Sequence, residues 1–208
     1  MNLISHKIES LRGEIVCPGD KSVSQRIIII GSLLNCDMQV NGFLNAHDPI
    51  ATANALKVIG AQISINGTEV ILKKRENLFN DSEHDLNLGN SGTGSRLLLG
   101  LISGLGLKST IIGDKSLQKR PMSRVIEPLK MMGAELSSNE GKLPIKTLGS
   151  KILDDFEYEM PIASAQVKSC LLLAALASKK NIKVIEPKIT RDHTERMIEF
   201  FGGNIFYG

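Results

Sequence analysis

Apolar and polar positions along the chain follow a pattern that occurs three times. Each copy begins with small and polar residues and continues into a dense apolar run. A short β-like stretch then leads into an amphipathic segment that ends at a glycine. These glycines, Gly60, Gly133 and Gly202, are about 70 residues apart. A period of that length is typical of a repeated supersecondary unit, so the pattern predicts a fold built from three similar units.

Comparison of the copies decides the structure of the dense apolar runs. Ile27–Ile30 alone would be read as a strand, because its residues are β-branched. Its counterparts, Leu97–Leu99 and Leu171–Leu176, favour a helix instead. We therefore expect three buried helices. Each is entered through small or polar residues, at 21–26, 90–96 and 164–168.

A strand and a second helix are predicted after each buried helix, and a hairpin follows in two copies. The expected strands are Met38–Phe43, Ser109–Ile112 and Ile182–Ile185. The second helices start near Asp48, Pro121 and Asp192, since Asp is a good N-cap and Pro suits a first turn. The hairpins pair Gln62–Ile65 with Val70–Lys73, and Glu135–Ser138 with Leu143–Lys146. The third copy reaches a strand at Asn204–Tyr207 without a return strand, so we expect the chain to be part of a longer protein.

The predicted unit is therefore βαβαββ, and the fold class is α/β. No low-complexity linker separates the copies, which indicates one compact domain. With 208 residues, 42% hydrophobic and 23% charged, the chain has the composition of an ordinary soluble globular protein. The apolar stretch Leu97–Leu107 is too short to span a bilayer, and no signal-peptide pattern is evident.

Charge and cysteine content narrow the function. The net charge of +3 comes without a dense Lys/Arg block, which argues against a nucleic-acid partner but suits small anions. Cys17, Cys36 and Cys170 are odd in number, widely spaced and without a CxxC motif. That pattern disfavours a disulfide framework or a zinc site and favours a reducing cytoplasm.

Five cations are expected at or near helix starts. A helix N-terminus carries unpaired N–H groups and partial positive charge, so cations placed there oppose the helix dipole. An incoming phosphate or carboxylate would resolve that conflict. If the repeats pack about a common axis, the helix starts converge and form an anion site. The cations are Lys21, Arg26, Arg96, Arg120 and Arg191.

Simpler readings of these residues remain open. A single Lys or Arg near a helix start is usually a solvated surface residue, and Ser22, Ser24 and Thr93 could be plain N-caps. The segment Asn90–Gly94 could be only a tight turn. It is neither a Walker A loop nor a GxGxxG fingerprint, since Leu97 stands where the third glycine belongs. The histidines show no metal spacing, and no GxSxG elbow occurs.

Five ordered motifs resemble those of one enzyme family, the 5-enolpyruvylshikimate-3-phosphate synthases. The first is similar to the PGDKSxSxR signature, the second to GNxGTxxR, and the third to a GDxSLxxRPM loop. The last two are similar to SAQVKS and TRDHTE segments of the class II bacterial branch. The motifs lie at Pro18–Arg26, Gly89–Arg96, Gly113–Met122, Pro161–Ser169 and Thr190–Met197. The resemblance runs from about Gly13 to Tyr207.

The resemblance implies an enolpyruvyl-transferase fold, an inside-out α/β barrel with two lobes. Each lobe has three βαβαββ repeats, and the active site lies in the cleft between the lobes. Residues 1–15 would then be a strand segment leading in from the other, missing lobe. Residues 16–208 would form the substrate-binding lobe, with its third repeat truncated.

The implied reaction transfers the enolpyruvyl group of phosphoenolpyruvate to the 5-hydroxyl of shikimate 3-phosphate, by addition and then elimination of phosphate. It belongs to the shikimate pathway, towards chorismate and aromatic amino acids, and glyphosate inhibits it. Gly92 leaves room for that inhibitor and predicts a sensitive full-length enzyme. The family's acid/base carboxylates lie in the other lobe, so this chain alone is expected to be inactive. No cofactor or metal is implied, and the full-length enzyme is expected to be a cytoplasmic monomer that binds neither membrane nor nucleic acid.

By motif position, the resemblance assigns substrate contacts to specific residues, with Lys21 as the one catalytic residue in this lobe. Shikimate 3-phosphate would contact Lys21, Ser22, Arg26, Ser164, Ala165, Gln166 and Arg191. Phosphoenolpyruvate would contact Lys21, Asn90, Gly92, Thr93, Arg120 and Gln166.

Two alternatives remain. The sister enolpyruvyl transferase that acts on UDP-N-acetylglucosamine shares the repeat architecture. It typically has Lys-Asn where this chain has Lys21-Ser22, and a reactive Cys in the loop that corresponds to Gly113–Pro121, where this chain has none. From another class, the chain could be a non-catalytic module that binds a phosphorylated ligand.

Overall fold

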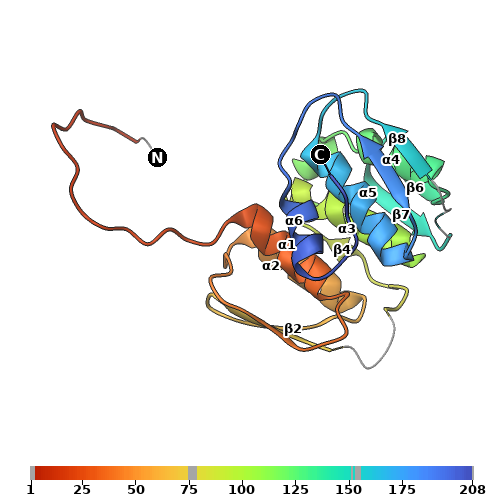
Figure 1. Ribbon diagram of the computed structural model, residues 1–208, viewed down its shortest axis with the longest axis horizontal. Coiled ribbons are helices and arrows are strands. Elements are labelled where there is room, and N and C mark those ends of the chain that lie inside the picture. Colours follow the sequence, from red (N-terminus) through yellow and green to blue (C-terminus); the bar gives the residue numbers. More distant parts are fainter. Residues whose placement is uncertain (1–2, 75–78, 151, 153–155, 208) are drawn as a thin grey trace.

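The computed structural model describes residues 3–74, 79–150, 152 and 156–207. Its elements follow the threefold repeat of the sequence, and the repeats form three small sheets around a central group of helices (Figure 1). In the described residues, no helix is long and apolar enough to cross a membrane.

The second repeat has the complete βαβαββ unit. Its sheet has the order β4-β5-β7-β6, with β4 parallel to β5 and the remaining pairs antiparallel. The elements are β4 (Leu86–Asn87), α3 (Gly92–Leu105), β5 (Lys108–Ile112), the short 3-10 helix η1 (Leu117–Lys119), α4 (Ser123–Met131), β6 (Leu136–Asn139) and β7 (Lys142–Leu148).

The first and third repeats contain parts of the same unit. Among the described residues, the first repeat has the antiparallel sheet β1-β3-β2, without a counterpart of β4, and the third has the parallel pair β8-β9 alone. The first repeat comprises α1 (Lys21–Gly31), β1 (Met38–Val40), α2 (His47–Val58), β2 (Gln62–Asn66) and β3 (Glu69–Lys73). The third comprises β8 (Phe156–Glu159), α5 (Ala165–Ser178), β9 (Ile182–Ile185) and α6 (His193–Phe200).

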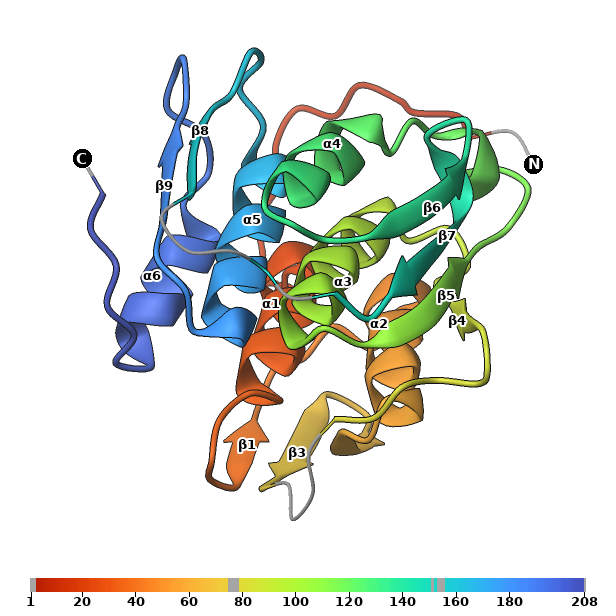
Figure 2. The same ribbon diagram turned by 90° about the vertical axis from the view of Figure 1, so that its right-hand side faces the viewer.

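The three predicted buried helices are confirmed as α1, α3 and α5, which lie side by side in the middle of the molecule (Figure 2). Each begins at a side chain that caps its first turn. Asp20 accepts from the Val23 N–H, Ser91 from Gly94, and Ser164 from Val167. Such caps satisfy N–H groups that lack a partner within the helix. The caps are therefore not Ser22, Ser24 or Thr93, the alternatives that the sequence left open.

The helices α3 and α5 make the closest contact in the core. At Gly100 and Gly104 of α3, a Cβ atom would lie only 2.1 Å from the Cys170 carbonyl oxygen and 2.2 Å from that of Ala174. Glycine at these positions lets the two backbones touch, which no larger residue permits. The surrounding core is aliphatic, as the composition predicts.

The glycine corners behave as predicted. Gly60, Gly133 and Gly202 have φ angles of 106°, 100° and 79°, in the region that favours glycine. Each follows the C-cap residue of α2, α4 or α6 and turns the chain out of the helix. The second helices themselves start a little differently from the prediction. Asp48 lies in the first turn of α2 rather than at its cap, and α4 begins at Ser123, after Pro121.

Some predicted strands are shorter than expected or absent. The strand predicted over Met38–Phe43 ends at Val40. The prediction of a strand at Asn204–Tyr207 is wrong, since these residues are irregular. Their counterparts β2 and β6 pair only with the return strands β3 and β7, and the described part of the third repeat has no return strand. An isolated strand has no partner for its backbone groups and does not form.

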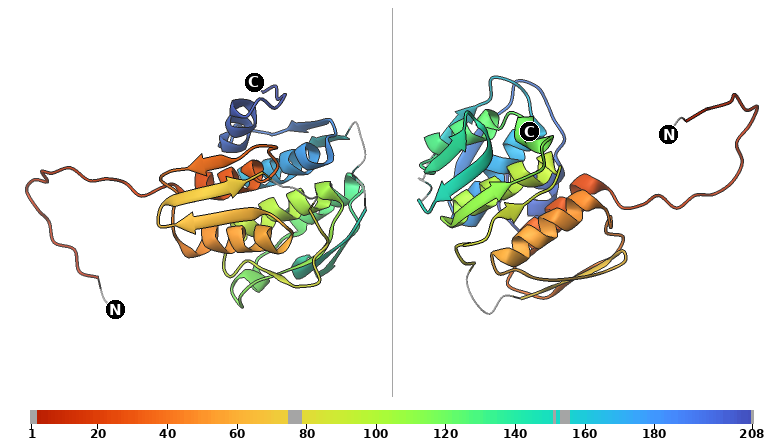
Figure 3. Two further views of the ribbon diagram at one scale, coloured as in Figure 1. Left: turned by 90° about the horizontal axis from the view of Figure 1, so that it is seen from below. Right: turned by 180° about the vertical axis from the view of Figure 1, so that it is seen from behind.

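The N-terminal residues form an extended arm. Residues 3–18 are all exposed, contain no strand, and project away from the rest of the molecule in both views of Figure 3. Within this chain the strand predicted over residues 1–15 is therefore absent where the structure describes it. The interpretation that this segment leads in from a second lobe stays a prediction.

Thiol reactivity gives a direct check of the packing between α3 and α5. Complete burial in that contact raises the pKa of the Cys170 thiol to about 12, so the thiolate does not form at neutral pH. Cys17 and Cys36 are exposed. We expect two thiols to react rapidly with an aromatic disulfide reagent at pH 8, and the third only in denaturant. Three equally fast thiols in the folded protein would contradict this packing.

Candidate anion-binding site at the helix starts

Side-chain hydrogen bonds join the first turns of the three central helices. Gln25 of α1 donates to Ser91 at the start of α3, with an N–O distance of 2.7 Å. Gln166 of α5 donates to Thr93 of α3 at 3.0 Å. Because the bonded residues all lie at or next to the first turns, the three N-termini converge at one end of the molecule. Their partial positive charges therefore add there.

Gln25 is a buried crosslink that holds α1, α2 and α3 together. Its side-chain amide also donates to Thr52 of α2 at 2.9 Å. A Cβ on Gly94 would lie 2.5 Å from the Thr52 hydroxyl and 3.0 Å from the Gln25 amide nitrogen. The last glycine of the Gly89–Gly94 segment is thus required by close packing around this crosslink.

Arg96 connects α3, α5 and the loop before α4. It donates to the Gln166 side-chain oxygen at 2.9 Å, and to the backbone oxygens of Gly92 and Pro121 at 3.1 and 3.0 Å. All three acceptors are neutral. The guanidinium therefore keeps its full charge near the start of α3, and no carboxylate among the described residues offsets it.

Further positive charges surround Arg96. Burial lowers the pKa of Arg96, and the nearby charges of Arg120 and Arg124 lower it further. Arg120 is exposed and donates to the Asn90 side-chain oxygen. Like charges repel, so the three clustered arginines destabilise one another unless an anion binds between them. This is the arrangement expected of a site that binds phosphate.

Arg26 lies deeper than the sequence indicated. It is only 5% exposed and donates to the Thr194 hydroxyl at 2.7 Å, the Ser169 hydroxyl at 2.9 Å and the Ser22 carbonyl at 3.1 Å. Burial lowers its pKa, and the charge of Arg191 adds to that effect. The bonds tie α1 to α5 and α6. Its predicted contact with ligand stays a prediction.

A buried ion pair fixes α6 against α5. The Lys168 ammonium lies 2.6 Å from Glu195 and 2.8 Å from Glu186. Burial alone would lower the pKa of Lys168, but the hydrogen bonds to both carboxylates outweigh it and raise that pKa. Glu195 directly follows Thr194, which accepts from Arg26, so this pair also positions the Arg26 guanidinium.

Lys21 stands at the first position of α1 with its side chain about half exposed. Its ammonium lies 3.2 Å from a carboxylate oxygen of Asp48. In the part of the chain that the structure describes, Lys21 is the one predicted site cation that has a carboxylate partner. Arg26, Arg96, Arg120 and Arg191 form no salt bridge with a described residue, which leaves the end of the molecule positively charged.

The other predicted site residues lie at the same helix starts. Ser22 is on α1, Gly92 and Thr93 begin α3, Asn90 precedes α3, and Ser164 and Ala165 begin α5. Sequence reasoning missed the neutral residues that hold them in place, namely Gln25, Thr52, Ser91, Ser169 and Thr194. Most of them lie within or beside the quoted motifs, but only the fold shows which of them are partners.

Comparison with protein families identifies the relationship. The model of the family EPSP synthase (3-phosphoshikimate 1-carboxyvinyltransferase) matches residues 5–207. The chain belongs to the EPSP synthase family. The 3-phosphoshikimate 1-carboxyvinyltransferase of Petrotoga mobilis is 45% identical over 201 residues, and that of Bartonella quintana is 42% identical over 205 residues. These matches cover 95% and 98% of this chain, and 46% of each relative.

Solved structures give the same result. A structure of EPSP synthase from Acinetobacter baumannii superimposes with a TM-score of 0.87 at 39% identity, over 94% of this chain and 45% of that one. The expected lobe of an enolpyruvyl-transferase fold is therefore confirmed. The chain spans about half the length of the EPSP synthases that it matches.

Proposed function

We propose that this chain supplies the substrate-binding lobe of an enzyme that transfers the enolpyruvyl group of phosphoenolpyruvate to the 5-hydroxyl of shikimate 3-phosphate. The supporting observation is the cluster of Arg96, Arg120 and Arg124 at converging helix N-termini, with no carboxylate partner for Arg96 or Arg120 among the described residues. Both substrates are polyanions that repel each other. A fixed set of positive charges offsets that repulsion and holds them together.

The predicted substrate-contact residues fall into two groups around that cluster, one for each substrate. Arg120, Asn90, Gly92 and Thr93 lie at the start of α3 and in the loop before α4, where they would hold phosphoenolpyruvate. Ser164, Ala165, Arg191 and the inner Arg26 line the side of α5 and α6, where shikimate 3-phosphate would bind. Gln166 of α5 bonds to Thr93 and Arg96 of α3, and Lys21 stands at the start of α1; both would contact both substrates. Arg96 acts as a positioning residue, because its donors are already bonded to Gln166 and to backbone oxygens.

The lobe is proposed to act with a second lobe, as a monomeric two-lobed enzyme in the cytoplasm. Three cysteines without a disulfide fit a reducing compartment. By the family resemblance, the acid/base groups would lie in the part of the enzyme that this chain does not match. This lobe alone should therefore bind ligand weakly and release no phosphate.

Two measurements test the proposal. Calorimetry at low ionic strength should detect weak binding of shikimate 3-phosphate, which falls as salt rises because the contacts are charged. Phosphate release from both substrates should be undetectable with this chain alone and should appear when the remaining part of the Petrotoga mobilis relative is added. Robust turnover by the chain alone, or no binding of either substrate, would refute the proposal. Tight binding without the added part would favour a binding module instead.

Gly92 provides a further test of the phosphoenolpyruvate site. A Cβ there would lie 2.8 Å from one Arg120 terminal nitrogen and 3.2 Å from one of Arg96, and both guanidiniums would have to move. We expect Gly92→Ala to weaken phosphoenolpyruvate binding roughly fivefold through displaced charge-assisted hydrogen bonds. The melting temperature should hardly change, since only flexible side-chain ends shift. NMR titration measures the affinity for phosphoenolpyruvate, and scanning calorimetry measures the melting temperature. A large loss of stability with unchanged affinity would contradict this geometry.

A further inference from the structure

A buried lysine joins the two ends of the loop between β9 and α6. The Lys168 ammonium of α5 lies 2.8 Å from Glu186, the first residue after β9, and 2.6 Å from Glu195, in the first turn of α6. The side chains of Lys168, Glu186 and Glu195 are 10%, 18% and 5% exposed. One positive charge thus closes the base of this loop, which contains Arg191, a predicted contact of shikimate 3-phosphate.

The loop has few other bonds to fix its shape. No backbone N–H of residues 187–192 donates to a backbone oxygen in the described part of the chain. The Thr190 N–H donates instead to one carboxylate oxygen of Glu186 at 3.1 Å, and the Thr190 hydroxyl donates to the other at 2.6 Å. Asp192 makes no side-chain cap bond at the start of α6. The conformation next to Arg191 therefore depends on the Glu186 carboxylate.

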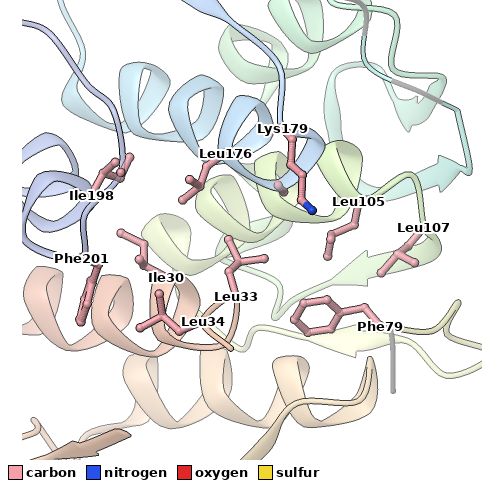
Figure 4. Close-up of a pocket in the computed structure, with 12 residues that line it drawn as sticks. Ile30, Leu33, Leu34, Phe79, Leu105, Leu107, Leu176, Lys179, Ile198 and Phe201 are labelled. Carbon is pink, nitrogen blue, oxygen red and sulfur yellow. The ribbon is translucent and has the colours of Figure 1, made fainter. Parts of the chain in front are cut away.

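The far end of α6 does not fix the loop either. Ile198 and Phe201, near that end, line an apolar cavity of about 550 Å³ (Figure 4). A helix end that borders a cavity lacks the close packing that would hold the whole helix rigidly. At its first turn, by contrast, α6 is held by the hydrogen bonds of Thr194 and by the ion pair of Glu195 with Lys168. Polar contacts therefore set the position at which α6 starts.

The loop also keeps two like charges near each other. Burial lowers the pKa of Arg26, and the charge of Arg191 lowers it further, while Glu195 raises it. Because like charges repel, a loop that was free to move would carry Arg191 away from Arg26. A buried ionic cluster seldom adds much stability over apolar side chains of similar volume, but in some proteins it specifies a single geometry. That role fits a cluster at the base of this loop.

We propose that the pair of Glu186 and Lys168 positions the Arg191 guanidinium before shikimate 3-phosphate binds. The inference rests on the proposed function, in which Arg191 contacts that substrate. Glu186 fixes the loop through its two bonds to Thr190, and Lys168 fixes Glu186 against α5 and α6. The substrate then meets a charge that is already in place, so none of its binding energy is used to order the loop. Neither positioning residue has to touch the substrate.

Glu186→Gln in the complete 208-residue chain tests the proposal, because positioning and direct charge effects have opposite signs. The variant removes a negative charge near the predicted site, which by Coulomb attraction alone would tighten the binding of a polyanion. We expect instead that shikimate 3-phosphate binds roughly tenfold more weakly, because Arg191 is no longer held in place. The affinity for phosphoenolpyruvate should not change, because most of its predicted contacts lie at the start of α3 and in the loop before α4. NMR titrations at low ionic strength measure both affinities.

Two further substitutions separate the role of the loop from charge and from stability. Glu157→Gln is the matched control, since Glu157 also pairs with a lysine, Lys183, but both side chains are more than half exposed. It should bind both substrates like the parent. Thr190→Val removes one bond to Glu186 without a change of charge and should weaken shikimate 3-phosphate about threefold. Thr190→Ser keeps the hydroxyl and should restore the affinity.

NMR relaxation without ligand shows whether the loop has been released. The backbone order of residues 187–192 should fall in Glu186→Gln and not in Glu157→Gln. Tighter or unchanged binding of shikimate 3-phosphate by Glu186→Gln, or an equal loss for both substrates, would overturn the proposal. If Glu186→Gln does not fold, as its circular dichroism spectrum would show, unchanged binding by Thr190→Val overturns it. A parent chain that binds neither substrate would refute the proposed function together with this inference, whereas normal binding by parent and variants alike would refute the inference alone.

Discussion

Replacing Gly100 by alanine should destabilise the protein by about 3 kcal/mol or more, at the upper end of what overpacking costs. The new Cβ would lie 2.1 Å from the Cys170 carbonyl oxygen and 2.9 Å from its carbon. Both belong to the backbone of α5, which cannot rotate away as a side chain can. The helices α3 and α5 would have to separate, and the contact at Gly104 and Ala174, one turn further along, would open with them.

Gly31→Ala is the matched control for this substitution. Gly31 also lies in a central helix, but its Cβ would meet the end of the flexible Met38 side chain. Alanine gains about 1 kcal/mol over glycine in a helix, which offsets the displacement of that methyl group. Urea denaturation of both variants gives the comparison. A Gly100→Ala protein as stable as Gly31→Ala would show that the two helices do not pack as closely as described.

Much of the fold could be predicted because each helix or strand of the repeat occurs in more than one copy, and the copies can be compared. Ile27–Ile30 resembles a strand alone, and only its leucine-rich counterparts identify it as part of a helix. The glycine corners were equally clear, since a glycine after each second helix meets the need for a positive φ. Agreement among copies is stronger than any local propensity, which tertiary packing often overrides.

The failed strand prediction has a different physical origin. Residues Asn204–Tyr207 carry the same pattern as β2 and β6, yet a pattern specifies a strand only where a partner supplies hydrogen bonds. The partner here would be a return strand on β9. Residues 3–18 behave similarly, because their apolar side chains are exposed and belong to no core of the described residues. Local sequence cannot report such a missing partner.

For the candidate site, the sequence indicates the charged residues but not the neutral residues that hydrogen-bond the helices together around them. The cations near helix starts were visible because they oppose the helix dipole. The neutral crosslinks of Gln25, Ser91 and Thr194 were not visible, since polar residues in a helix are ordinarily read as surface residues. Arg26 was expected at the ligand but is mostly enclosed. Which side chains bond across repeats depends on helix packing, which the repeat pattern alone does not determine.

Arg120→Ala should weaken phosphoenolpyruvate binding about thirtyfold while leaving the folded protein slightly more stable. A charge-assisted hydrogen bond to phosphate contributes about 2 kcal/mol, which corresponds to that factor. In the free protein, however, Arg120 raises the cost of charging its neighbour Arg96. Removing it relieves a like-charge contact worth a few tenths of a kcal/mol. The two effects have opposite signs, which is typical of a residue kept for binding rather than for folding.

Lys57→Ala provides the control for Arg120→Ala. It removes the same unit of charge from an exposed position at the far end of α2. A general dependence of binding on net charge would weaken both variants equally. A local site would leave Lys57→Ala near the parent affinity in NMR titrations at low ionic strength. If Arg120→Ala instead lost stability and kept its affinity, its bond to Asn90 would be structural. The positive cluster at the helix starts would then have some purpose other than holding a phosphorylated substrate.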